Sequence, residues 1–278
     1  MSTVPPSRAA ALRGCWHPLA YAADVGGDGC AAPLLGEPLE VRRRADGALD
    51  VPGAAATAER YGIVWAALAP PRWPIPDVPE LVDAAWRTVP TGPFAWRCDA
   101  SRQVENFTDF GHFAFVHPGL LGDPDDAVVA PHEVRADGPV LRYAYGRPDT
   151  PNTDDFPVFA DAERKDATRR TRYALHLPYT IVEHIDWAGA DGLLYFFASR
   201  PVSDDRCVGY CLVARNYNLD QPDAVIQAFE RTIFGQDQRV VESQRPERVP
   251  FDLAAELHLT FDAVAVAYRR AMAAHGFA

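Results

Sequence analysis

The segment ENFTDFGHFAFVH, residues 105–117, combines a helical pattern with side chains suited to binding a metal. Asp109 and His112 are three residues apart and share one face of the helix that we expect from about residue 101 to about residue 112. The carboxylate can accept the imidazole N–H and leave the other ring nitrogen free, as in most metal-bound histidines. His117 lies about 140° further around an ideal helix, so both histidines reach one metal only if the helix ends between them. The alternative is two unrelated histidines beside a turn.

A second segment, FGQDQRVVESQ at residues 234–244, places a carboxylate on the buried face of a long helix. Apolar residues recur every four positions through the helix expected at about 222–243: Val225, Phe229, Ile233 and Val241. Asp237 takes the remaining step of this stripe. An unpaired buried carboxylate is unfavourable, and either a metal or a core salt bridge with Arg239 or Arg245 would offset that cost. Because two histidines and one carboxylate form the facial triad of non-haem Fe(II) oxygenases, the two segments together predict an iron site.

The composition favours an ordinary folded protein and argues against several classes of partner. The 278 residues suffice for one large domain, or for a domain with a smaller companion, and 48% of them are hydrophobic. The 38 acidic and 27 basic residues give a net charge of −11, which argues against binding nucleic-acid phosphates or an anionic membrane surface. No apolar run is as long as a membrane span and residues 1–13 lack a signal-peptide core, so we expect a cytoplasmic protein.

The pattern along the chain predicts an α+β fold in two parts. We expect residues 1–10 to be a disordered tail. Short strands and turns follow in residues 11–79, which end in a proline-rich connector. Residues 80–278 form the larger domain, in which strands at 130–150 and 168–216 precede the helix at 222–243 and a last helix at 253–274.

Two longer segments resemble the catalytic domain of Rieske-type aromatic-ring-hydroxylating oxygenases. They are WRCDASRQVENFTDFGHFAFVHPGLLG (96–122) and FERTIFGQDQRVVESQRP (229–246), and the nearest branch is that of vanillate O-demethylase and pheophorbide a oxygenase. The resemblance implies a helix-grip (Bet v1-like) fold, in which a curved antiparallel sheet wraps long helices.

The resemblance also implies roles for individual residues. By this likeness, the iron ligands are His112, His117 and Asp237. Asp109 corresponds to the aspartate that links the iron site to a neighbouring subunit's cluster, and Asn106 corresponds to an asparagine near the iron. Relatives of this kind are often trimers.

The sequence departs from the family where a Rieske cluster would be bound. Such a cluster needs two cysteines and two histidines, in the family as Cys-x-His followed by Cys-x-x-His. Cys15-Trp16-His17 has the first spacing but belongs to the family's opening strand, and Cys-x-x-His is found nowhere in the chain. Between Gly47 and Arg60 stand twelve residues, where relatives carry several dozen. We therefore expect no [2Fe–2S] cluster and a small N-terminal β remnant of a Rieske domain.

The predicted function is a mononuclear non-haem Fe(II) oxygenase that uses O2 on a small aromatic or polycyclic substrate. The reaction would be oxidative ring or C–C cleavage, hydroxylation or demethylation. Hydroxylation and demethylation need two electrons beyond those that the substrate gives. A separate Rieske protein or ferredoxin would dock and deliver them by way of Asp109. Alternatively an electron-rich substrate, such as a hydroquinone, supplies all four. We favour this second route, because loss of the cluster is tolerated most easily when no internal electron carrier is needed. A non-catalytic ligand-binding or scaffold subunit stays open as a different class.

The strands expected at 168–216 supply weaker candidates for substrate contacts, again by the family resemblance. His176, His184 and Phe197 lie where the family lines its substrate pocket, although a structural role is the more common one for such histidines. Trp187 is a further aromatic residue of this region, expected in the core or the pocket wall. The chain contains no Gly-rich phosphate loop and no nicotinamide fingerprint, so we expect it to bind neither a flavin nor a nicotinamide.

Overall fold

The computed structural model describes residues 6–145, 170–186 and 191–278. A large antiparallel sheet runs in the order β7-β14-β13-β12-β11-β10-β9, and β8 also pairs with β14. Its strands are β7 (Arg87–Pro90), β8 (Phe94–Trp96), β9 (Val134–Asp137), β10 (Val140–Tyr145), β11 (Arg170–His176), β12 (Thr180–Asp186), β13 (Gly192–Ser203) and β14 (Arg206–Arg215). The helices of this part are α2 (Ala100–Asn106), α3 (Phe113–Val116), α4 (Asp223–Val241) and α5 (Ala263–Ala274).

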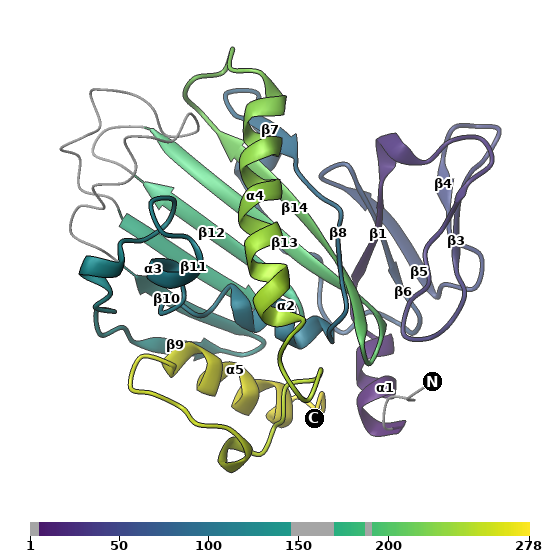
Figure 1. Ribbon diagram of the computed structural model, residues 1–278. Helices are drawn as coiled ribbons and strands as arrows, with labels where there is room; N and C mark the ends of the chain where they lie inside the picture. Colours follow the sequence, from purple (N-terminus) through teal and green to yellow (C-terminus); the bar gives the residue numbers. More distant parts are fainter. Residues whose placement is uncertain (1–5, 146–169, 187–190) are drawn as a thin grey trace.

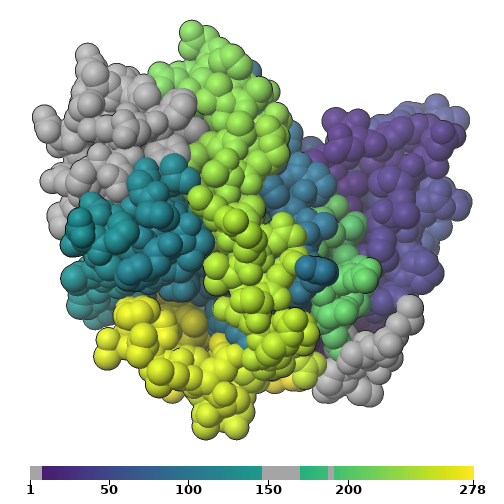
Figure 2. Space-filling view, viewed as in Figure 1, coloured from purple at the N-terminus to yellow at the C-terminus, as the bar shows by residue number. Residues whose placement is uncertain are grey.

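Helix α4 lies across one face of the large sheet, and the C-terminal residues cover its lower edge (Figures 1 and 2). The strands alternate in the usual way, so successive side chains point to opposite faces. Tyr173, Tyr195 and Phe197 face the α4 side, whereas Leu194 and Phe196 face the N-terminal strands. An antiparallel sheet packed on a long helix confirms the predicted α+β fold class.

The N-terminal residues form a smaller β unit beside the large sheet (Figure 1). One sheet has the order β1-β6-β5 and the other β2-β3-β4. The elements are α1 (Pro6–Arg13), β1 (His17–Tyr21), β2 (Cys30–Ala31), β3 (Glu40–Arg43), β4 (Leu49–Asp50), β5 (Ala56–Arg60) and β6 (Ile63–Ala67). The rings of Tyr61 and Trp65 pack edge-on against Phe196 of β13, which attaches the unit to the rear of the large sheet. No helix of the described residues has both the length and the apolar character needed to cross a lipid bilayer.

The prediction of a disordered tail over residues 1–10 is wrong for residues 6–10, which belong to α1. Arg8 is fully buried, and its Nη2 donates to both carboxylate oxygens of Asp99 at 2.9 Å and to the Tyr179 hydroxyl at 3.0 Å. The partner carboxylate lies 91 positions away in the sequence, so no local pattern reveals the ion pair. Residues 1–5 lie outside the described residues.

Two helix predictions also need correction. The helix expected at 101–112 ends at Asn106, and the chain turns before the short α3 begins. At Gly111 an added Cβ would lie 2.7 Å from the Phe261 ring, so this turn fits closely against the C-terminal segment. The helix expected at 253–274 is a short 3-10 turn at Leu253–Ala255, with α5 starting only at Ala263. The intervening segment is held by ion pairs of Glu256 with two arginines of neighbouring elements.

Replacing Arg8 by alanine should destabilise the fold strongly. The substitution leaves the buried Asp99 carboxylate without its cation, and such a loss typically costs about 3–5 kcal/mol. Urea unfolding of wild type and Arg8→Ala measures the difference. Arg44→Ala is the control, because its ion pair with Asp46 is exposed and is worth about 0–1 kcal/mol at most. Equal effects of the two substitutions would contradict a structural role for α1.

Candidate functional site

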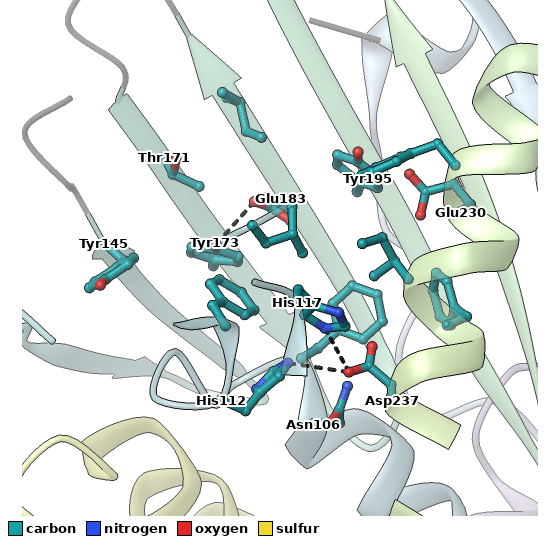
Figure 3. Close-up of a pocket in the computed structure, with 17 residues that line it drawn as sticks. Asn106, His112, His117, Tyr145, Thr171, Tyr173, Glu183, Tyr195, Glu230 and Asp237 are labelled. Atoms are coloured by element: carbon teal, nitrogen blue, oxygen red, sulfur yellow. Dashed lines mark hydrogen bonds and ion pairs between the residues drawn. The ribbon is translucent and has the colours of Figure 1, made fainter. Parts of the chain in front are cut away.

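Three predicted ligands meet between α3 and α4 (Figure 3). His112 immediately precedes α3 and His117 immediately follows it, so a single helical turn presents both imidazoles to the same point. Asp237 comes from the buried face of α4. Its Oδ1 lies 2.8 Å from Nε2 of His117 and 3.3 Å from Nε2 of His112. Within the described residues, no other group of three or more His, Cys, Asp or Glu side chains has this metal-binding arrangement.

The donor atoms fit a metal ion better than they fit one another. Nε2 of His117 and Oδ1 of Asp237 are buried and have no hydrogen-bond partner, although they are in contact. Donor atoms bound at right angles about 2.1 Å from one ion lie about 3 Å apart, close to the two distances from Oδ1 of Asp237 to the imidazole nitrogens. Among the described contacts, the ion-pair partners of Asp237 are the two histidines, whereas Arg245 pairs with Glu247. The geometry therefore favours a metal site over the core salt bridge.

Gln236 orients the second histidine, a contact that the sequence did not predict. The amide Oε1 of Gln236 lies 2.7 Å from Nδ1 of His117. Because an amide oxygen only accepts hydrogen bonds, Nδ1 carries the proton and Nε2 keeps a free lone pair for a metal. The only signal in the sequence is the position of Gln236 directly before Asp237, which by itself does not indicate contact with a histidine from another helix.

Asp109 connects the first histidine to the protein surface. Its Oδ2 lies 3.4 Å from Nδ1 of His112, and its Oδ1 accepts the N–H of Gly111 at 2.8 Å. The Asp109 side chain is 41% exposed. It lines a surface depression of about 190 Å³ that also contains Leu257, an apolar side chain that is 85% exposed. The predicted proximity of Asp109 to His112 is therefore present, and Asp109 is open to a partner molecule.

The charges around the triad favour a proton when no metal is bound. Burial lowers the pKa of His112, but the carboxylates of Asp109 and Asp237 outweigh it and raise the pKa to about 9. Burial also acts to raise the pKa of Asp237, yet the close contacts with the imidazoles of the two histidines hold it below its ordinary value. A metal ion must therefore displace a proton from this site, as is usual for histidine ligands.

A mostly apolar cavity of about 110 Å³ opens directly from the triad. Seven aromatic rings line its wall: Phe107, Phe113, Tyr145, Tyr173, Tyr195, Phe229 and Phe234. Asn106 lines the cavity beside Asp237 (Figure 3). Two further acids, Glu183 and Glu230, belong to the wall and were missed by the sequence analysis. The sequence pattern could have indicated Glu230, because it lies two helical turns before Asp237 on the same buried face of α4.

None of the three weaker substrate candidates lines this cavity. The side chain of His184 points away from the cavity, and its Nε2 lies 3.2 Å from Glu80. His176 lines a separate small cavity beside Cys15 and Trp16. Strand alternation explains both positions. His184 follows Glu183, which lines the cavity, and His176 follows Leu175, which lies in the core, so each histidine points to the other face of the sheet. Phe197 is fully buried and stacks on Phe107 at 4.4 Å, one layer below the wall; Trp187 lies outside the described residues.

Comparison with known proteins shows the same architecture in a defined family. The model for the vanillate O-demethylase oxygenase C-terminal domain matches residues 96–276. Methylxanthine N1-demethylase NdmA of Pseudomonas putida is 31% identical over 220 residues, covering 76% of this chain and 58% of that protein. The chain thus spans a little more than half the length of this relative. The probable methylxanthine N7-demethylase NdmC of a Pseudomonas strain is 26% identical, covering 92% of this chain and 91% of that protein.

A solved structure of Pseudomonas putida NdmA with caffeine superimposes on the fold with a TM-score of 0.78. The match covers 95% of this chain and 91% of the NdmA chain at 24% sequence identity. At this level of identity the likeness concerns the fold.

Purified protein loaded with Fe(II) should hold close to one iron per chain, and Asp237→Ala should hold almost none. The substitution removes one of three donor atoms and leaves two histidines that cannot complete the site. Elemental analysis of both proteins measures the difference, with Asp137→Ala, an exposed acid of β9, as the control. Undiminished iron in Asp237→Ala would place the metal elsewhere.

Gln236→Leu should weaken metal binding by about 10–100-fold, the usual effect of losing a group that orients a ligand. Competition with a chromophoric chelator gives the affinity. Gln236→Glu should restore most of it, since the carboxylate again accepts from Nδ1 of His117. Gln238→Leu is the matched control on the outer face of α4, where Gln238 donates to the Ala95 carbonyl; a loss equal to that of Gln236→Leu would show that any change in α4 disturbs the site.

Proposed function

The chain belongs to the family of the vanillate O-demethylase oxygenase C-terminal domain, and we propose that it is a mononuclear non-haem iron oxygenase for a small aromatic or polycyclic substrate. The observation that carries this proposal is the buried triad of His112, His117 and Asp237 at the end of an aromatic cavity. Fe(II) bound there would supply the activation of O2. Retention of the complete ligand set argues against the alternative of a non-catalytic subunit.

The protein's own groups would prepare the site for this reaction. Gln236 fixes the ring of His117, and Asp109 faces the outer nitrogen of His112, so both imidazoles present Nε2 to the metal. The aromatic walls receive a flat apolar ring and exclude water from around it. Asn106 brings an amide to the cavity wall next to the triad, where it can hold a polar substituent of the substrate.

We further propose that the electrons come from a separate iron–sulfur protein. Relatives named as demethylases favour this route over a self-sufficient one, because demethylation with O2 needs two electrons from outside the substrate. The absence of an internal Rieske cluster remains a prediction. It is supported by the short connection from β4 to β5 and by His17, whose fully buried Nε2 contacts the Leu12 carbonyl at 2.9 Å. Assembly into a trimer also stays a prediction.

Turnover separates the two electron routes. The Fe(II)-loaded protein is mixed with O2 and candidate methoxylated and N-methylated aromatics, with and without a ferredoxin and its reductase. We expect sustained product formation only with the donor system. Each demethylation would consume two donor electrons, and 18O2 would deliver one oxygen atom to the released formaldehyde, trapped before it exchanges with solvent, and the other to water. Many turnovers without any donor, with both oxygen atoms in the product, would instead establish ring cleavage of an electron-rich substrate.

Asp109→Asn should keep the iron and lower the donor-dependent rate by about 10–100-fold. The amide still faces His112 but has lost the charge on the exposed side of the site. Iron content and steady-state rate are measured on the same preparations, with the exposed Asp125→Asn as the control. An unchanged rate would mean that Asp109 serves only to build the turn at Gly111.

A further inference from the structure

Two buried glutamates face the cavity from opposite sides (Figure 3). Glu183 belongs to β12 and its Oε1 accepts a hydrogen bond from the Tyr173 hydroxyl at 3.0 Å. Glu230 belongs to α4 and is only 2% exposed. Its Oε1 is buried and has no hydrogen-bond partner within the described structure. A buried acceptor left unpaired is costly, so the cavity contains an acceptor that a bound molecule can satisfy.

The surroundings of Glu230 disfavour an uncompensated negative charge. Burial raises its pKa to about 8; a hydrogen bond from Tyr195 opposes this shift, while the charges of Glu183 and Asp237 add to it. The described lining residues include no arginine or lysine. An aromatic carboxylate entering the cavity would thus meet two acids and no cation from these residues. A ligand with a positive charge would instead stabilise the ionised carboxylate of Glu230, and a ligand with an N–H donor would satisfy its unpaired oxygen.

The rest of the wall suits such a ligand. Phe229 lies one position before Glu230 on α4, and Phe107, Phe113 and Tyr173 also line the cavity. The faces of aromatic rings attract cations and N–H groups as well as apolar surface. The unpaired oxygen of Glu230 among these aromatic rings therefore suits a planar molecule that carries one hydrogen-bond donor.

We propose that Glu230, assisted by Glu183, binds a nitrogen of the substrate that carries a hydrogen, as an ammonium, an amidinium or a ring N–H. The substrate class is then a nitrogen-bearing aromatic compound, and aromatic carboxylates of the kind represented by vanillate are rejected. This inference rests on the proposed function in one respect, since it takes the cavity beside the triad as the substrate pocket. Glu230 becomes a residue that determines specificity.

Binding of ring-matched ligands tests the inference without any turnover. Methoxybenzylamine, methoxybenzyl alcohol and methoxybenzoate, with the methoxy group at the same position, share the ring and differ in one substituent, which is cationic, neutral or anionic. The same trio on a naphthalene ring controls for the fit of the aromatic body. Isothermal titration of the full chain, anaerobically and both with and without Fe(II), gives each affinity. In at least one trio the amine should bind about 10–100-fold more tightly than the alcohol, and the carboxylate should bind most weakly.

Isosteric variants assign the effect to the acids. In Glu230→Gln the preference for the amine over the alcohol should disappear, while affinity for the alcohol stays within a few-fold of wild type. Glu183→Gln removes the second charge from the facing strand and should lower amine affinity independently, which covers the case that one variant does not fold. Glu242→Gln, at the end of the same helix but bonded to Arg97 outside the cavity, should retain the wild-type ranking.

The possible outcomes separate this inference from the oxygenase assignment. An amine that is not the tightest ligand in either trio, or a preference unchanged in folded Glu230→Gln, would overturn the role of Glu230. Iron binding and O2-dependent turnover would still stand in that case. Conversely, a chain that ranks the ligands as expected but binds no iron would refute the oxygenase and leave the recognition of nitrogen donors intact.

Discussion

The convergence of Asp237 on two imidazoles is the constraint around which the rest of the molecule is arranged. The carboxylate of Asp237 lies on the buried face of α4, where an uncompensated charge is unfavourable. His112 and His117 compensate that charge only because α3 is a single turn and places both rings at the same point. A longer helix across this segment would carry the two rings to different sides, so the early end of α2 is a requirement of the site.

Helix α2 is anchored at both ends, and these anchors position the histidines that follow it. Asp99 accepts the N–H of Ser101 at the start of the helix and also binds Arg8 from α1. Near the other end, Glu105 forms a two-point ion pair with Arg269 of α5, at 2.7 and 2.8 Å. The first and last helices of the described chain therefore both contact α2 and fix the direction in which the chain reaches the metal-binding turn.

The large sheet supplies the remaining walls, and its alternation gives its two faces different tasks. One face carries Tyr173, Glu183 and Tyr195 toward α4 and the cavity. The other face is apolar and packs on the N-terminal β unit, which includes Trp65. The β unit thereby shields the rear of the sheet, while the surface beside Asp109 stays open on the side of the triad. Substrate and electrons would thus approach the triad from different directions.

The sequence alone predicted the three candidate ligands and the fold class, from the spacing of local motifs and from the resemblance of those motifs to a known family. Asp237 occupies a step of an apolar stripe, and the two histidines follow Gly111 closely in the sequence, so three candidate ligands were visible before any contact was known. Only the tertiary structure decided which strand residues line the cavity, since a shift of one position reverses the facing of a side chain. That is why Glu183 was missed beside His184. Long-range partners such as Gln236 for His117 have no local signature, because their meeting depends on how α4 packs on the sheet.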